Sequence, residues 1–363
     1  MIELRCVRCD RMTAEPFSGC PHCGGILELP SAPVATVSAS PAAGVWGQLG
    51  DLGFKGLVPV SLGEGATPLV PLVPDTSRDL VKFEGANPTG SWKDRLHAVN
   101  TAVARHLGHS GMALHSTGNS ALAAAAYAAR AGLSLRAYLR PGTPRTIQEA
   151  VRQFGAEVEM VTEAAPNLRV LLDSEGLFPA TMSLPHTVAC PFGLEGYKTI
   201  AYEIAAELGE APDWVAVPVG CGDGLYAITK GFRELLAWGR ITRLPRMLAA
   251  QASAAAPLVC AYEAGAETVT AVEMKPTIAI SIADPIAGEH ALAAVRRTGG
   301  RAMAVSDEAI RTALDRLCAG GIFAEAASAA SVAAVAAARA SGMITPEAQV
   351  VSVVTSSGLR WLY

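Results

Sequence analysis

Strand-like and helix-like segments alternate along most of this chain of 363 residues. Short apolar runs bounded by Gly and Pro take turns with longer stretches whose apolar residues recur at helical spacing. We predict, in order, helix 92–108, strand 111–115, helix 120–131, strand 134–139, helix 145–155, strand 157–161, helix 195–208, strand 213–218, helix 225–238, strand 246–251, helix 326–341 and strand 348–354. Such alternation is typical of parallel sheets with helices on both faces, so we predict an α/β fold.

Composition limits the classes of protein to which the chain can belong. Hydrophobic residues make up 50% of it, so it can bury a sizeable core and divide into two or three units. A formal net charge of -4 provides no basic field and argues against nucleic acid as a main partner. The Ala-rich runs are too weakly apolar to span a membrane, and the first residues lack the basic-then-apolar order of a signal peptide. We therefore expect a cytoplasmic protein.

Two C-x2-C pairs lie near the N-terminus, Cys6 with Cys9 and Cys20 with Cys23. Each pair can turn its thiolates toward one point, and two such pairs supply the four tetrahedral sulfur ligands of a structural zinc ion. Disulfides are the alternative, which the lack of a secretion signal disfavours. A site closed by four thiolates has no open position, so we expect the metal to hold the fold and take no part in chemistry.

The sequence divides into three parts. We predict a zinc ribbon over residues 1–30, a linker and entry segment rich in Pro and Ala over 31–60, and a larger domain over 61–363.

Residues 83–95, FEGANPTGSWKDR, combine an extended approach, a turn and the start of a helix. Lys93 falls on the first turn of that helix, where the helix dipole favours anions and disfavours a lysine. A solvated surface lysine is the ordinary interpretation. Three further motifs at the carboxyl ends of predicted strands, where ligands of such folds collect, favour a functional amine instead.

The first of these motifs is STGNS, residues 116–120, which opens a helix. Small residues at a helix start offer backbone N–H groups to a carboxylate, so Ser116, Thr117 and Ser120 are candidate substrate-binding residues. Asn119 can offer its amide to a ring oxygen. Ser, Thr and Asn are also ordinary N-cap residues, so the motif is weak evidence when taken alone.

The second motif is a glycine-rich loop between a predicted strand and a predicted helix, made of Gly220, Cys221, Gly222, Asp223 and Gly224. Glycines there let the backbone close on a phosphate, which the N–H groups and the positive helix end attract. A dinucleotide site is the alternative, but the spacing is not G-x-G-x-x-G. A single small phosphate fits better. Asp223 is awkward in an anion site and must point away or bind something else.

The third motif is TSSG, which begins at Thr355 after the last predicted strand. A hydroxyl at this strand end can serve as a neutral hydrogen-bonding partner for a ring nitrogen. A Ser/Thr turn near the C-terminus is the interpretation that would be preferred if the motif stood by itself.

Together the motifs carry a family resemblance. They occur in the order found in threonine synthase and its relatives, within the fold type II pyridoxal-phosphate enzymes: KFEGANPTGSWKDR, STGNSALAAAAYAARAG, VPVGCGDGLYAITKGF, AQASAAAPLV, TIAISIADP and VTSSGLR. The resemblance runs from Gly63 to Arg360, and the cysteine pairs resemble a zinc ribbon of some threonine synthase-like proteins. It implies the tryptophan synthase beta-like fold: two parallel-sheet subdomains around the cofactor, the smaller and mobile one near residues 95–180, and commonly a homodimer.

The resemblance also implies roles for the motifs. Lys93 becomes the lysine that binds pyridoxal phosphate covalently and then acts as a base beside the substrate Cα. Asn119 contacts the ring hydroxyl, the loop from Gly220 to Gly224 binds the phosphate, and Thr355 faces the pyridine nitrogen. In threonine synthase the leaving group is the phosphate of O-phosphohomoserine, and water then adds at Cβ.

Departures from threonine synthases keep the substrate open. A stretch that usually reads N-P-x-R-x-E-G-Q-K-T reads CPFGLEGYKT here, with Cys190, Gly193 and Tyr197 in place of Asn, Arg and Gln. The phosphate loop reads GCGDG where GNGGN is usual, and an upstream Gly-Asn-Phe-Asp segment appears as TEAAPN, residues 162–167. The missing arginine matters because a dianionic leaving group favours a bidentate cation. The residues that can supply a replacement charge are Arg140, Arg145, Lys198 and His115.

The sequence is therefore consistent with three functions. The first is a threonine synthase-like lyase that eliminates phosphate from an O-phospho amino acid and adds water. The second is a divergent enzyme that catalyses β-elimination or β-replacement on a serine, threonine or phosphoserine type of amino acid. The third is a non-catalytic binding protein that acts through its zinc ribbon.

Overall fold

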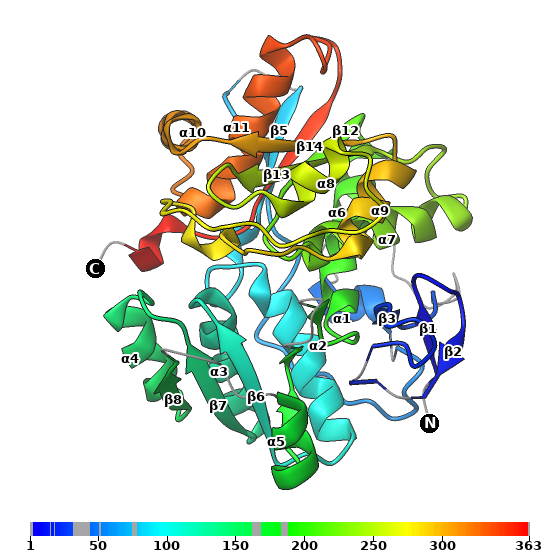
Figure 1. The fold of residues 1–363 in the computed structure, drawn as a ribbon, viewed down its shortest axis with the longest axis vertical. Helices are drawn as coiled ribbons and strands as arrows, with labels where there is room; N and C mark the ends of the chain where they lie inside the picture. The colour runs from blue at the N-terminus through cyan, green and yellow to red at the C-terminus, as the bar shows by residue number, and fades with distance from the viewer. Residues whose placement is uncertain are drawn as a thin grey trace. The chain divides into compact units, whose positions relative to one another are not determined.

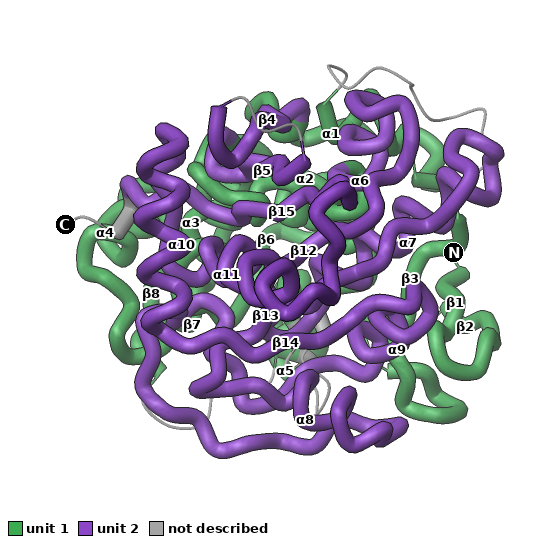
Figure 2. Tube along the Cα trace, turned by 90° about the horizontal axis from the view of Figure 1, so that it is seen from above, with its two compact units in different colours: residues 1–65, 87–199, 363 green, residues 66–86, 200–362 purple. Residues whose placement is uncertain are grey.

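The computed structural model describes residues 3–14, 16–17, 19–31, 44–50, 52–74, 78–161, 168–182 and 188–361. The chain forms two compact units, and each is built from separate stretches of sequence (Figure 2). Unit 1 comprises residues 1–65 and 87–199, and unit 2 comprises residues 66–86 and 200–362. Residues 32–43 and 51 of the predicted linker and entry segment, 31–60, and the segment 162–167 lie outside the described residues.

Unit 1 begins with a small antiparallel sheet, which we call the cysteine ribbon. Its strands β1 (Leu4–Cys6), β2 (Met12–Thr13) and β3 (Leu27–Glu28) lie in the order β2-β1-β3. A short helix, α1 (Gly44–Leu49), follows.

The main sheet of unit 1 has four parallel strands in the order β8-β7-β6-β9. The strands are β6 (Gly111–Ser116), β7 (Ser134–Leu139), β8 (Glu157–Met160) and β9 (Phe178–Pro179). The helices are α2 (Lys93–His106), α3 (Asn119–Ala131), α4 (Arg145–Gln153) and α5 (Leu168–Glu175), and β10 (Thr181–Met182) pairs with β11 (Val188–Ala189). Helix α3 packs on β6, β7 and α2, so the start of α3 and the start of α2 belong to one packed layer.

Unit 2 contains a six-stranded sheet in the order β14-β13-β12-β15-β5-β4, in which only the β4–β5 pairing is antiparallel. Its strands are β4 (Leu69–Pro71), β5 (Asp79–Phe83), β12 (Trp214–Pro218), β13 (Arg246–Ala252), β14 (Arg301–Val305) and β15 (Val350–Val354). Its helices are α7 (Asp223–Ala237), α8 (Pro257–Glu263), α9 (Glu289–Arg297), α10 (Asp307–Ala319) and α11 (Ala326–Ala340). The short 3-10 turns are η3 (Glu84–Ala86), η4 (Ile280–Ile282) and η5 (Gly358–Trp361). Helix α6 (Leu194–Leu208) starts in unit 1 and ends in unit 2.

Helices cover both faces of this larger sheet (Figure 1). Alternate strand residues such as Ala216, Leu248 and Ala250 pack into one cluster with α10 and α11. The intervening residues, among them Val215 and Ala249, are also fully buried, and α7 and α9 pack against β12 and β13. Burial on both faces explains why these strands read as continuous apolar runs rather than as alternating ones.

The predicted α/β fold with two parallel-sheet units is confirmed. Each predicted helix and strand has a counterpart whose ends lie within a few residues of the prediction. The domain boundaries proposed from the sequence stay a prediction. Among the described residues, no helix is long and apolar enough to cross a membrane.

Candidate active site

Lys93 is the first residue of α2. Asp94 holds the turn that precedes the helix: its carboxylate accepts hydrogen bonds from the Thr89 N–H at 2.9 Å and from the Thr89 hydroxyl at 2.8 Å. The Asp94 side chain is fully buried, so this link fixes the path of the motif into the helix. No side chain caps the start of α2.

The amine of Lys93 lies among aromatic rings of unit 1. Its Nζ is 5.8 Å from the centre of the Trp92 ring and 5.6 Å from that of Tyr197, and the two rings lie 4.7 Å apart. Lys93 is half-buried. The ring of Tyr197 can reach this place because Gly196 lets α6 approach α2: a Cβ on Gly196 would lie 1.9 Å from the Arg95 carbonyl oxygen.

One turn along α2, His97 connects this helix to the STGNS motif. Its Nε2 lies 2.7 Å from the Ser120 hydroxyl, next to Asn119. Burial, reinforced by the nearby charge of Lys93, lowers the pKa of His97 to about 3. The imidazole is therefore neutral over the working range of pH, and the hydrogen bond links the Lys93 helix to the Asn119 loop within unit 1.

The STGNS motif lies at the carboxyl end of β6, as predicted. The Ser116 hydroxyl accepts hydrogen bonds from the Gly118 N–H at 2.9 Å and the Ala121 N–H at 3.1 Å, so it shapes the loop. Asn119 is buried and begins α3, in whose first turn the Ser116 hydroxyl satisfies the Ala121 N–H. Thr117 is half-buried. Of the three candidate substrate-binding hydroxyls, those of Ser116 and Ser120 thus have partners inside the unit.

The glycine-rich loop lies in unit 2 between β12 and α7. A Cβ on Gly220 would lie 2.6 Å from an Asp284 carboxylate oxygen, and one on Gly222 would lie 2.4 Å from the Ala291 Cβ. Gly222 also has φ of 105°, which side chains rarely adopt. No side chain caps the start of α7. The loop therefore combines a position that requires glycine, Gly222, and a crowded one at Gly220 with an uncapped helix start, which is what an anion site needs.

Thr355 directly follows β15 and is buried. Its hydroxyl lies 2.9 Å from that of Ser328 on α11. Nearby, Gly85 of the FEGANPTG motif packs on the same strand end, since a Cβ there would lie 2.7 Å from the Ser357 nitrogen. Within unit 2 the structure thus brings the beginning of the lysine motif beside the TSSG motif.

The candidate residues are distributed over both units. Lys93, Asn119 and the loop 116–120 belong to unit 1, and the loop 220–224 with Thr355 belongs to unit 2. Sequence reasoning did not single out Trp92, His97 and Ser328 as neighbours of these residues. Trp92 lies inside the lysine motif but was given no role of its own. His97 and Ser328 contact residues 23 and 27 positions away, and no local motif marks them.

Position 193, where threonine synthases usually carry arginine, is crowded, so a side chain there would require its neighbours to shift. A Cβ on Gly193 would lie 2.7 Å from the Asn100 side-chain oxygen and 2.8 Å from Leu96. Among the candidate replacements, Lys198 is buried in an ion pair with Glu195 one turn earlier on α6, and exposed Arg145 pairs with Glu149 at 2.7 Å.

Arg140 and His115 lie at the carboxyl edge of the four-stranded sheet. The Arg140 N–H donates to the Ser116 carbonyl at 3.1 Å, so Arg140 begins beside the STGNS loop, and it is exposed. His115 is half-buried against the edge of Tyr138, with 5.6 Å between ring centres. By position, Arg140 is the cation best placed to reach a ligand at this loop.

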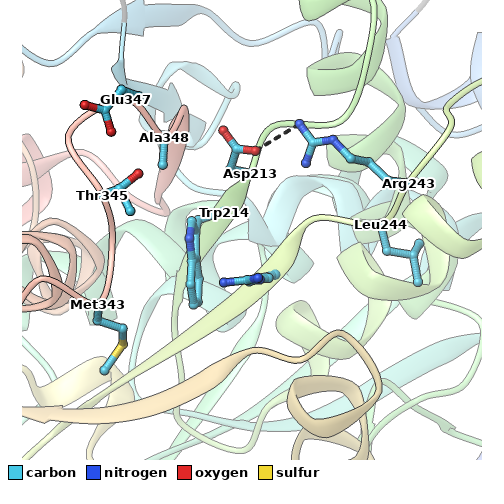
Figure 3. A pocket seen from close by; sticks show the side chains of 9 residues that line it. Asp213, Trp214, Arg243, Leu244, Met343, Thr345, Glu347 and Ala348 are labelled. Atoms are coloured by element: carbon cyan, nitrogen blue, oxygen red, sulfur yellow. Dashed lines mark ion pairs between the residues drawn. The ribbon is translucent and has the colours of Figure 1, made fainter.

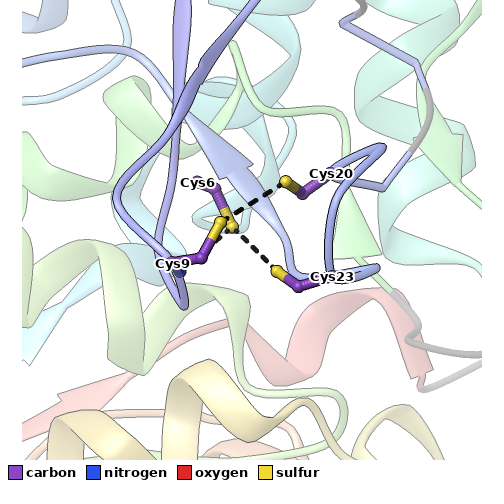
Figure 4. A group of neighbouring side chains, drawn as sticks. All are labelled: Cys6, Cys9, Cys20 and Cys23. Carbon is purple, nitrogen blue, oxygen red and sulfur yellow. Dashed lines mark hydrogen bonds between the residues drawn. The ribbon is translucent and has the colours of Figure 1, made fainter.

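The four N-terminal cysteines converge (Figure 4). Their sulfur atoms all lie within 4.8 Å of one another, with Cys6 to Cys23 at 3.5 Å and Cys9 to Cys20 at 3.7 Å. Four thiolates around a zinc ion at about 2.3 Å stand about 3.8 Å apart, so the arrangement fits that metal. Gly25 must be glycine because a Cβ there would lie 2.9 Å from the Cys6 sulfur.

A pocket of about 510 Å³ opens at the amino edge of the six-stranded sheet (Figure 3). Arg243 pairs with Asp213 at 3.1 Å, and the Arg246 guanidinium lies over the Trp214 ring at 5.4 Å. The glycine-rich loop and Thr355 lie at the opposite, carboxyl edge, where α/β folds place their ligands.

Comparison with known proteins decides the family. A model described as "Pyridoxal-phosphate dependent enzyme" matches residues 60–356. The chain belongs to this family. Among curated members, threonine synthase from Methanocaldococcus jannaschii is 36% identical over 380 residues, which cover 98% of this chain and 92% of the relative. Threonine synthase from Mycobacterium tuberculosis is 38% identical over 311 residues, which cover 83% and 84%.

Solved structures of other enzymes share the fold of this pyridoxal-phosphate family member. L-serine ammonia-lyase from Rhizomucor miehei has a TM-score of 0.68 and 21% identity, covering 83% of this chain and 95% of that one. Maize serine racemase has a TM-score of 0.66 and 20% identity, covering 80% and 88%. At such identities the likeness concerns the fold alone.

The chain is therefore a pyridoxal-phosphate dependent lyase of the elimination and replacement class. The alternative of a non-catalytic binding protein is not supported. The residues present fit the cofactor, because the glycine loop leads into an uncapped helix start through Gly222, whose φ of 105° side chains rarely adopt, and Lys93 supplies an amine at the start of α2.

Proposed function

We propose that this lyase eliminates an anionic leaving group from an amino acid and then adds water, as a threonine synthase-like enzyme, with O-phosphohomoserine as the parent substrate. The observation that carries the proposal is the 36% identity to a threonine synthase along 98% of this chain, which includes the cysteine ribbon.

In this proposal each motif keeps the role that the resemblance implied. Lys93 binds the cofactor covalently, Asn119 contacts its ring hydroxyl, and Thr355 faces its ring nitrogen. The phosphate is bound by the backbone of the loop from Gly220 to Gly224. Ser116, Thr117 and Ser120 frame the loop that receives the substrate carboxylate, with Ser116 and Ser120 acting mainly through the loop shape that their hydrogen bonds maintain.

Bound pyridoxal phosphate supplies an electron sink that makes the Cα proton of an amino acid acidic and lets a leaving group depart. The protein supplies the base: the Lys93 amine takes the proton from Cα and can return it. The rings of Trp92 and Tyr197 cover this amine and restrict the access of water. The neutral His97 beneath it adds no second positive charge that would disfavour a proton on Lys93.

Because position 193 is glycine, another residue must supply the positive charge that binds an anionic leaving group. We assign this role to Arg140, because its backbone N–H donates to the Ser116 carbonyl, which places it beside the STGNS loop, and it is exposed. Arginine suits a phosphate because its planar group donates two parallel hydrogen bonds.

The filled space at Gly193 also favours a second candidate. An enzyme that lacks the arginine of threonine synthases can accept a smaller or less charged leaving group, so β-elimination or β-replacement on a serine, threonine or phosphoserine type of amino acid is the alternative.

A substrate screen tests the proposal. The purified protein should be yellow, and Lys93→Ala should lose the covalently attached cofactor whereas a change at exposed Lys275 should not. O-phosphohomoserine, phosphoserine, serine and threonine are then added separately, and the released phosphate, ammonia and amino-acid products are identified by mass spectrometry. Threonine and phosphate from O-phosphohomoserine support the first candidate. Turnover of a serine or threonine derivative alone supports the second, and a colourless protein that binds no cofactor contradicts both.

We also propose that the cysteine ribbon binds one structural zinc ion, that the protein works in the cytoplasm and that it forms a homodimer. The four cysteines of the ribbon converge and form no disulfide, as zinc ligands require. We further keep the proposal that a smaller subdomain near residues 95–180 moves to close over substrate. Light scattering in solution tests the dimer, and elemental analysis tests the zinc.

A further inference from the structure

The glycine-rich loop contains a carboxylate at the place where the proposed function needs an anion to bind. Asp223 is the first residue of α7, and the start of a helix attracts its own aspartate as readily as it attracts a phosphate. If the Asp223 carboxylate turned toward the loop N–H groups, it would occupy them and repel a second anion. The loop can bind a phosphate only if this side chain is held elsewhere.

The structure shows where the carboxylate goes. One oxygen, Oδ1, accepts a hydrogen bond from His290 Nε2 at 3.1 Å, and the other, Oδ2, accepts one from the Cys221 thiol at 3.2 Å. The His290 side chain is completely buried and that of Asp223 is 10% exposed. Both carboxylate oxygens thus have donors from side chains of unit 2.

The imidazole is itself held in place. The edge of His290 meets the Tyr226 ring, with 5.3 Å between ring centres and an angle of 79° between the planes. Gly288 backs the ring so closely that a Cβ there would lie 1.9 Å from His290 Cε1. In addition, the Gly288 N–H donates to the Cys221 carbonyl at 2.7 Å, which ties the start of α9 to the loop.

The proton arrangement follows from these contacts. A carboxylate only accepts hydrogen bonds, so His290 Nε2 must carry the proton. The other ring nitrogen, Nδ1, is buried and has no hydrogen-bond partner among the described residues. The bond to Asp223 is therefore the polar contact that orients the imidazole, and loss of His290 would release Asp223.

We propose that His290 is a positioning residue for the cofactor site: with Cys221 it turns the Asp223 carboxylate away from the loop N–H groups and so keeps the loop open to the phosphate of pyridoxal phosphate. The inference rests on the proposed role of this loop. In this inference the Asp223 backbone contributes to phosphate binding, whereas the Asp223 carboxylate is held away from the phosphate.

The test compares pyridoxal phosphate with pyridoxal, which lacks the phosphate but has the same aldehyde. Affinities of both for the full chain are measured by cofactor absorbance and equilibrium dialysis. In the unaltered protein, a strong preference for pyridoxal phosphate establishes that a phosphate site exists. If the unaltered protein binds neither molecule, the proposed function fails, and the inference fails with it; the variants below test the inference alone.

His290→Ala should weaken binding of pyridoxal phosphate about tenfold or more, because a buried hydrogen-bond partner is lost, and leave pyridoxal binding nearly unchanged. Asp223→Asn removes the competing anion, so the double variant His290→Ala/Asp223→Asn should recover most of the lost preference. Gly288→Ala is a second way to displace the ring and should act in the same direction. Far-UV circular dichroism confirms that each variant is folded.

Two results would overturn the proposal. One is a preference for pyridoxal phosphate that stays the same in both His290→Ala and Gly288→Ala. The other is a double variant that binds pyridoxal phosphate no better than His290→Ala, which would mean that the Asp223 charge does not compete with the cofactor phosphate.

Discussion

At the scale of single residues, the structure explains features that the motifs alone left unclear. Lys93 stands at a helix start that disfavours cations, yet its amine lies against the faces of Trp92 and Tyr197, which attract a cation. Asp223, awkward in an anion loop, has its carboxylate bound by His290 and Cys221. Each polar residue that conflicts with its local position thus has a partner from a distant part of its own unit.

His97 should make the stability of the protein depend on pH. Unfolded histidine takes up a proton below pH 6.5, whereas folded His97 does so only near pH 3, so in this window the unfolded state binds more protons. The contribution of His97 is full above pH 6.5 and is lost as pH falls toward 3. When pH falls from 7 to 5, the free energy of unfolding of the unaltered protein should decrease by about 2 kcal/mol more than that of His97→Gln.

Urea unfolding at several values of pH measures this difference. His106→Gln, at an exposed position on the same helix, is the matched control and should keep the slope of the unaltered protein. Equal slopes for His97→Gln and the unaltered protein would show that His97 titrates normally.

A variant at Arg140 tests whether the leaving group is a phosphate. If Arg140 binds a substrate phosphate, Arg140→Gln should lower kcat/KM for an O-phospho amino acid about tenfold or more, because a charged hydrogen-bond donor is lost. Turnover of an uncharged analogue should change little. Arg145→Gln, five residues on and paired with Glu149, is the control. An equal loss for charged and uncharged substrates would contradict the assignment.

At the scale of elements, local signals predicted much of the fold. The segments around β12 and α7 were predictable because glycines separate a buried apolar run from a helical pattern. The stretch between β13 and α11 was left without predicted elements, although α10 carries a recognisable start: the Ser306 hydroxyl caps it by accepting from the Ala309 N–H at 3.2 Å. The short strand β14 has no such signal, because its pairing with β13 defines it.

The candidate site divides in the same way. Lys93, the STGNS motif and the glycine loop were predictable because Gly, Asn and Ser mark the places where strands give way to helices. His290 was not, since it reaches Asp223 across 67 residues of sequence. The crowding at Gly193 was equally hidden, because Leu96 and Asn100 come from another helix.

The cysteine ribbon should stabilise unit 1 through one aromatic residue. Phe17, between the two cysteine pairs, is 8% exposed and meets the rings of Phe178 and Phe192 at 5.1 and 6.1 Å. We expect Phe17→Ala to cost about 3 kcal/mol of unfolding free energy. Phe154→Ala, at a position that is 45% exposed, should cost much less.

Metal removal should act on the same contact. Zinc binds thiolates, so a chelator or acidic pH should release it and lower the unfolding temperature of the unaltered protein. The decrease should be smaller in Phe17→Ala, because the ribbon is then already detached from the aromatic rings. A protein with full cysteine content and no bound zinc would contradict the metal assignment.

At the scale of the whole molecule, two distant stretches of sequence must join to complete unit 2. Residues 66–86 supply β4 and β5, and β5 pairs with β15 near the other end of the chain. The fully buried Lys82 of β5 strengthens this junction: its amine lies 2.8 Å from Glu203, which is also fully buried, and 3.1 Å from Glu207.

Lys82→Met should therefore destabilise the protein by about 3–5 kcal/mol, because it leaves the Glu203 charge buried without its cation. Adding Glu203→Gln should recover part of the loss, because it removes the buried charge and keeps an acceptor for one of the two N–H groups, Ala66 or Thr67, that Glu203 binds. Arg243→Met breaks an exposed pair with Asp213 and should cost under about 1 kcal/mol. Denaturant titration compares them, and equal losses for Lys82→Met and Arg243→Met would exclude the proposed role.

The crowding around Gly193 also bears on how this enzyme can change. A single mutation that restores arginine there would collide with Leu96 and Asn100 before it could meet any substrate. An arginine there therefore requires the side chains of Leu96 and Asn100 to shift or to be replaced by smaller ones. Directed evolution of substrate choice should therefore vary position 193 together with Leu96 and Asn100.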